Sequence, residues 1–141
     1  MKVVIVGSKD RVGESDRALT HELMTLAAKT YPGCIFVTML TQEGVGQYVK
    51  EKCLQQDERG NWWGQFVECN VRLYAKTLSK TDTSAIYLAR NATVAELCDV
   101  LVFLASPGRK GMVEELADRI KALGRPYVVL MPGDPARLPS V

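Results

Sequence analysis

Three features of the 141-residue chain predict a three-layer α/β/α fold with a mostly parallel five-stranded sheet. Short apolar runs rich in β-branched residues alternate with segments in which apolar residues recur at helical spacing, from one end of the chain to the other. The runs are apolar throughout, which is typical of strands buried on both faces of a parallel sheet. No repeat, low-complexity tract or linker interrupts the alternation, so we expect residues 1–141 to form a single domain.

The first half of the chain predicts two strands and two helices. Lys2–Gly7 and Cys34–Leu40 are the apolar runs, and a helical pattern extends between them from Ser15 until Tyr31-Pro32-Gly33 ends it. A second helix opens near Gly44. The expected inward positions of the two helices are Leu19, Leu23, Leu26, Ala27, Val45, Tyr48, Val49 and Cys53.

The second half continues the alternation after a polar loop at Gln55–Gly64 and contains a second polar stretch at Thr77–Ser84. The expected strands are Phe66–Leu73, Val100–Ala105 and Tyr127–Met131, and the expected helices are Ala85–Cys98 and Gly111–Leu123. Gly124 and Pro126 follow the last helix in the order expected at a helix end. A short proline-rich tail begins at Pro132.

Composition narrows the classes of function. The net charge of +2 comes from scattered charges, which argues against a nucleic-acid or membrane partner. No apolar run approaches the roughly 20 residues of a membrane helix, and the amino terminus does not resemble a signal peptide. The four cysteines lack CxxC spacing and His21 is the only histidine, so we expect no metal site and buried thiols in a reducing cytoplasm.

Right-handed crossovers in a parallel sheet place the loop after every strand at the same edge, where ligands bind in such folds. We therefore expect the functional site at this carboxyl edge. The loops concerned are Gly7–Gly13, Thr41–Gly46, the region before Arg90, Ser106–Gly111 and Pro132–Asp134.

The first loop does not match the familiar phosphate-binding motifs. It has one spacer too many for a Walker A loop, and Glu14 stands where that motif needs lysine. The second glycine of the dinucleotide fingerprint is also missing. We therefore expect no NAD, FAD or ATP bound in those modes, and no cofactor.

Two of these loops leave alternatives open. The loop after Gly7 either binds a ligand through Ser8 and backbone amides or is a solvated turn. Gly44-Val45-Gly46 either lets an anion approach the main chain or forms a tight turn without a ligand.

Two motifs of the second half flank an expected strand. Arg90-Asn91 precedes the strand, and Pro107-Gly108-Arg109-Lys110-Gly111-Met112-Val113-Glu114-Glu115 follows it. These motifs resemble those of the SLOG superfamily. The superfamily consists of Rossmann-like nucleotide-binding domains and includes the LOG ("Lonely guy") phosphoribohydrolases and the DprA and YspA-type proteins. LOG enzymes carry Pro-Gly-Gly-x-Gly-Thr-x-x-Glu at this place, and Arg-Asn resembles the YspA-type branch. Pro107, Gly108, Gly111 and Glu115 match that pattern, whereas Arg109 replaces a glycine and Met112 the threonine.

The resemblance implies binding or sensing of a nucleotide or nucleoside-phosphate derivative. Because Met112 has no hydroxyl for a phosphate, binding is the first hypothesis, with Arg109 either supplying the missing contact or blocking the pocket. The alternative is an N-glycosidic hydrolase or deoxyribosyltransferase that uses Arg90 and Glu115. A third hypothesis is single-strand binding through Arg11, Arg109, Lys110 and the tryptophans, which ranks low because no basic stripe is present. Related domains pair through helices, which implies a homodimer.

Each candidate residue also has a structural alternative. Arg90 binds a phosphate bidentately or pairs with Glu96 or Asp99. Asn91 contacts a base or ribose, or caps its helix. Glu115 acts at the sugar or pairs with Arg119 four residues on, and Glu114 takes its role if the helix starts one residue differently. Trp62 and Trp63 stack on a base or pack at an interface, or they close over the sheet edge as core. The ligand-binding candidates are Gly7, Ser8, Gly44, Gly46, Asn91, Pro107, Gly108, Arg109 and Gly111.

Overall fold

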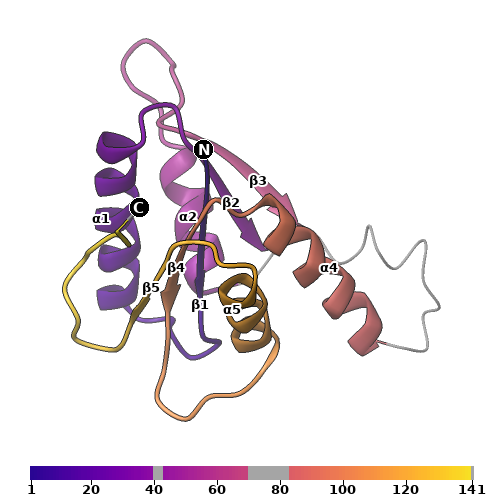
Figure 1. Ribbon diagram of the computed structural model, residues 1–141. Helices are drawn as coiled ribbons and strands as arrows, with labels where there is room; N and C mark the ends of the chain where they lie inside the picture. Colours follow the sequence, from indigo (N-terminus) through magenta and orange to yellow (C-terminus); the bar gives the residue numbers. More distant parts are fainter. Residues whose placement is uncertain (40–42, 70–82, 141) are drawn as a thin grey trace.

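A computed structural model describes residues 1–39, 43–69 and 83–140, which form five strands and four helices (Figure 1). In chain order the elements are β1 (Lys2–Gly7), α1 (Glu14–Thr30), β2 (Ile35–Met39), α2 (Val45–Cys53), β3 (Gln65–Cys69), α4 (Thr83–Leu97), β4 (Val100–Leu104), α5 (Met112–Ala122) and β5 (Tyr127–Leu130). Each begins within two residues of its predicted start. Residues 70–73 of the expected third strand and most of the polar stretch after it lie outside the described residues.

The sheet has the strand order β3-β2-β1-β4-β5, and every neighbouring pair is parallel. In the central strand, Val4 pairs with Val37 of β2 on one side and with Leu101 of β4 on the other. This confirms the predicted parallel five-stranded sheet. The chain first builds outward from β1 to β3 and then returns to the other side of β1, so the strand order reverses between β1 and β4. Ligands of open α/β sheets bind at such a reversal, outside the carboxyl ends of the strands.

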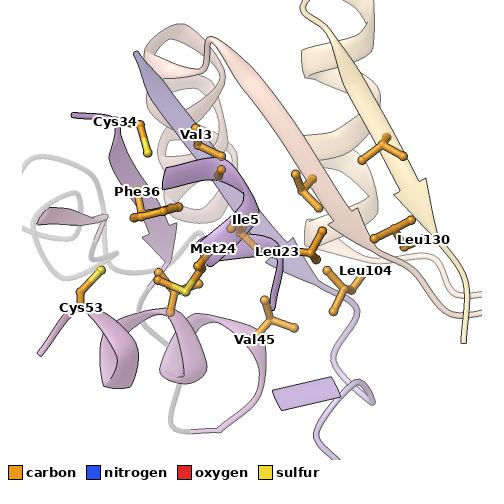
Figure 2. Close-up of a cluster of buried hydrophobic side chains, with 14 residues drawn as sticks. Val3, Ile5, Leu23, Met24, Cys34, Phe36, Val45, Cys53, Leu104 and Leu130 are labelled. Atoms are coloured by element: carbon orange, nitrogen blue, oxygen red, sulfur yellow. The ribbon is translucent and has the colours of Figure 1, made fainter. Parts of the chain in front are cut away.

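Helices cover both faces of the sheet and create two separate apolar cores. Val3 and Ile5 of β1 point to the face covered by α1 and α2, whereas Val4 and Val6 point to the face covered by α4 and α5. This alternation is the two-residue period of a strand, and both positions are apolar because both faces are buried. Figure 2 shows the first core, in which Phe36 packs with side chains of α1 and α2. The Rossmann-like three-layer fold predicted from the sequence is therefore observed.

The two tryptophans lie at the amino edge of the sheet, just before β3 begins. The Trp63 ring stacks on Phe36 with 5.9 Å between ring centroids, and Lys52 Nζ lies 4.5 Å from the centroid of Trp63. Trp62 is 58% exposed. Trp63 thus extends the first core, and both rings are remote from the carboxyl edge.

All four cysteines are free and buried, as the sequence predicts. Cys34 and Cys53 lie in the core beneath α1 and α2 (Figure 2), and Cys98 lies in the core beneath α4 and α5. Burial is the main cause that raises the pKa of the Cys53 and Cys98 thiols to about 12. The nucleophilic thiolate is therefore scarce at these positions near neutral pH.

We expect the native protein at pH 8 to react with Ellman's reagent far more slowly than the unfolded chain, in which all four thiols become reactive. A native thiol as reactive as free cysteine would contradict this expectation.

The free energy of unfolding should also fall as the pH rises from about 9 to 12. In the unfolded chain these thiols ionise at about pH 8.5. In the folded protein the pKa of the Cys53 and Cys98 thiols is raised to about 12, so the folded protein loses stability as the pH rises between these two values. Urea titrations at several pH values measure this dependence of the free energy of unfolding on pH, with Cys98→Ala as the control.

Candidate functional site

A cavity of about 520 Å³ opens at the carboxyl ends of β1 and β2. Its walls are residues 6–9 after β1, Thr38 and Met39 of β2, residues 43–46 before and within α2, Tyr87 and Arg90 of α4, and Arg109 with residues 111–114 at the start of α5. Small-molecule sites in proteins occupy about 300–1,000 Å³. The cavity therefore has the size of a ligand site at the edge that the topology favours.

Gly7 and Gly44 bring the start of α2 to this cavity. A Cβ atom on Gly7 would lie 2.3 Å from Val45 Cγ2, so only glycine lets α2 approach the end of β1 this closely. Gly44 is the N-cap of α2 and has a φ of +96°, a conformation that favours glycine. Gly44, Val45 and Gly46 all line the cavity, and the amides of a first helical turn have no partner within the helix.

The start of α5 lies on the other side of the same cavity. Gly111 is the N-cap of α5, and no side chain makes a capping hydrogen bond there. Gly111, Met112 and Val113 line the cavity. The positive ends of two helix dipoles thus lie at one cavity, which favours an anionic ligand.

Arg90 is the buried cation of the cavity wall. Its side chain is 6% exposed, and its guanidinium carbon lies 4.9 Å from the centroid of the Tyr87 ring. Arg90 Nη2 donates to Asn91 Oδ1 at 3.3 Å. Asp99, one of the two acids considered as its partner, instead accepts from the backbone N–H of Lys2 at 2.7 Å. The structure therefore places a guanidinium beside the two helix starts.

Asn91 connects Arg90 to α5. It is fully buried, and its Nδ2 donates to Met112 O at 2.8 Å and to Glu115 Oε2 at 2.6 Å. With Oδ1 accepting from Arg90, both donor hydrogens and the acceptor of the amide are used. Asn91 is not among the described residues that line the cavity, so its contacts support the site from behind.

The two glutamates of the α5 start have different surroundings. Glu115 Oε1 accepts from Arg119 Nε at 2.9 Å and from Arg119 Nη2 at 2.7 Å, and Glu115 Oε2 accepts from Asn91. Both carboxylate oxygens of Glu115 are thus held within the protein, and Glu115 is not among the described lining residues. Glu114 does line the cavity, and its Oε2 is buried without a hydrogen-bond partner in the described structure. The helix starts at Met112, one residue after its predicted start, and of its two glutamates Glu114 is the one that lines the cavity.

The loops after β1 and β4 are fastened to each other beside the cavity. Ser8 donates its backbone N–H to Leu104 O at 2.8 Å, and Ser8 Oγ accepts from the backbone N–H of Ser106 at 3.2 Å. Ser106 Oγ donates to Asp10 Oδ1 at 2.6 Å, and this hydrogen bond lowers the pKa of Asp10. Of the expected ligand contacts in the second loop, Arg109 and Gly111 line the cavity, whereas Pro107 and Gly108 are exposed outside it.

Arg11 has a role that sequence reasoning missed. It was grouped with surface cations, yet it is 4% exposed and lies across the ends of two strands. Arg11 Nη1 donates to Ala105 O and, at 3.1 Å, to Leu130 O, and Arg11 Nε donates to Asp16 Oδ1 at 2.6 Å. These contacts fix the loop after β1 and remove Arg11 from any nucleic-acid surface.

Thr38 is a further lining residue that the sequence analysis did not single out. It is the one polar side chain in the run Ile35–Met39, and it lies next to the carboxyl end of the strand. A polar residue at the carboxyl end of an otherwise apolar buried strand is the signal in the sequence that could have identified Thr38.

The fold and the cavity define a Rossmann-like α/β protein with a cavity at the carboxyl edge of its sheet. No family model matches the chain, and a search of the curated proteins finds no match. No helix in the described part of the chain is long and apolar enough to cross a membrane. Within the same residues, no group of three or more potential metal ligands occurs.

Proposed function

We propose that this protein is a SLOG-type domain that binds or senses a nucleotide or nucleoside-phosphate derivative in the carboxyl-edge cavity. One observation carries the proposal: the buried guanidinium of Arg90 and the starts of α2 and α5 line the same cavity. A guanidinium and free helix-terminal amides are both well suited to hold a phosphate group.

The charge of the lining supports a phosphate-bearing ligand. Lys9, Arg90 and Arg109 contribute three positive charges, and Glu43 and Glu114 contribute two negative charges. The net positive charge of these side chains adds to the positive ends of the two helices. The apolar side chains of Met39, Val45 and Val113, which also line the cavity, offer a surface for a base. A nucleoside phosphate combines these requirements in one ligand.

We expect calorimetric titration with nucleotides, cyclic nucleotides and ADP-ribose derivatives to detect binding of at least one of them. Arg90→Met should weaken that binding about tenfold or more, because a charge-assisted contact to phosphate contributes about 1.5–3 kcal/mol. Arg59→Met is the control, since Arg59 is exposed in the loop near the amino edge and should leave affinity unchanged. Absence of heat with every compound, or equal affinity of Arg90→Met and the natural protein, would refute the proposal.

A further inference from the structure

Two residues that line the cavity, Glu114 and Thr38, each have a buried oxygen atom without a hydrogen-bond partner in the described structure, Glu114 Oε2 and Thr38 Oγ1. Buried polar atoms in proteins are nearly always hydrogen-bonded, and an unsatisfied one costs free energy. From these atoms we infer that the cavity recognises the sugar hydroxyls of its ligand and selects ribonucleotides over 2′-deoxyribonucleotides. The inference rests on the proposed function and extends it to the ligand class.

The two glutamates at the start of α5 differ in how available they are to a ligand. Glu115 has both oxygens engaged by Arg119 and Asn91, so a ligand would have to break contacts of 2.6–2.9 Å to reach it. Glu114 lies on the cavity wall, and in the described structure no protein group donates a hydrogen bond to its Oε2 that a ligand would have to displace. The last torsion of a glutamate is broad, so the carboxylate turns this oxygen toward the cavity at little cost. Of the two α5 glutamates, Glu114 is therefore the one available to a ligand.

Thr38 is a second unsatisfied polar group, on an element other than that of Glu114. Thr38 is 1% exposed and comes from β2, on a different wall of the cavity from α5. Its hydroxyl donates and accepts, but Oγ1 has no partner in the described structure. A carboxylate on one wall and a free hydroxyl on another suit a ligand that carries several hydroxyl groups.

The charge of the cavity disfavours a cationic ligand group as the donor to Glu114. The helix starts and the cations Lys9, Arg90 and Arg109 make the cavity positive, which disfavours a ligand ammonium. A neutral donor is needed, and sugar hydroxyls supply it next to a phosphate. An acidic side chain that accepts from the ribose 2′-hydroxyl is an established solution in Rossmann-type sites.

The experiment measures the affinities of AMP, GMP, CMP and UMP and of their 2′-deoxy forms, with inorganic phosphate as a probe without sugar. For the natural protein we expect the ribonucleotide to bind about tenfold tighter than its 2′-deoxy form, the ratio that corresponds to one hydrogen bond to a charged group. Glu114→Gln should reduce this ratio to about two or less and leave phosphate affinity unchanged. Thr38→Val should weaken the ribonucleotide but not phosphate.

Glu115→Gln is the matched control, because the same chemical change is made one residue away. It should keep the ribose preference while lowering affinity for phosphate and nucleotides alike, since Asn91 and Arg90 lose their support. Thermal unfolding separates the two acids again: Glu114→Gln removes no hydrogen bond and should not lower the melting temperature, whereas Glu115→Gln should.

The outcomes distinguish the two proposals. Equal affinities for ribo and deoxy forms, or a preference that survives Glu114→Gln, would overturn ribose recognition and leave nucleotide binding standing. No binding of any monophosphate or of phosphate would overturn both. A large loss of stability in Glu114→Gln would show that this carboxylate has a structural partner, which contradicts the inference.

Discussion

Replacing Arg11 with methionine should lower the free energy of unfolding by about 3–5 kcal/mol, the loss typical of breaking a buried ion pair. The substitution removes the ion-pair partner of Asp16 at 2.6 Å and leaves its carboxylate only the backbone N–H of Gly13 as a donor. It also removes the donor to Ala105 O and Leu130 O at the ends of β4 and β5. Methionine fills similar volume, so the loss reports the polar contacts and not a cavity. Urea unfolding followed by circular dichroism measures it.

The control for Arg11 is Arg17→Met. Arg17 also forms an ion pair, with Glu51 at 2.9 Å, but both side chains are more than a third exposed. Exposed pairs contribute about 0–1 kcal/mol, so this variant should remain close to the natural protein. Losses of similar size in Arg11→Met and Arg17→Met would show that burial does not decide the contribution of Arg11.

The sequence predicted the elements because local pattern determines them. The β-branched run of Lys2–Gly7 and the helical spacing that ends before Gly33 depend only on neighbouring residues. A glycine before two acids is likewise a local signal, and it placed the start of α5 within one residue: Gly111 is the N-cap and the helix begins at Met112. These features are confirmed, and so is the parallel sheet that the alternation implies.

Contacts over long sequence distances were beyond the same reasoning. Arg11 reaches Leu130, 119 residues along the chain, and nothing near Arg11 distinguishes it from a surface arginine. The roles of Glu114 and Glu115 likewise depend on Asn91 of α4, whose side-chain amide donates a hydrogen bond to Glu115 of α5. A motif predicts which helix turn carries an acid, but the packing of α4 against α5 decides which acid reaches the cavity.

Gly7→Ala should lower the free energy of unfolding by about 3 kcal/mol, at the upper end of the usual cost of overpacking. The new Cβ would lie 2.3 Å from Val45 Cγ2 and 3.0 Å from Val45 Cβ, in a region where Val45 is buried. The φ of Gly7 is not positive, so alanine fits the backbone and the clash alone causes the loss. Relief requires α2 to move away from β1, which also displaces the amides of the α2 start from the cavity. Nucleotide affinity should therefore fall with stability.

Two further variants test whether the clash with Val45 causes the loss of stability in Gly7→Ala. Gly64→Ala adds the same methyl group where the nearest atom, Cys53 Sγ, lies at 3.5 Å, so it should change stability by less than about 1 kcal/mol. Val45→Ala removes the clashing methyl groups, so Gly7→Ala should cost less in that background by about 1–2 kcal/mol. Additive losses in the double variant would show that Gly7 is needed for a reason other than the close approach of α2. Recovery of nucleotide affinity together with stability would tie the position of the α2 start directly to ligand binding.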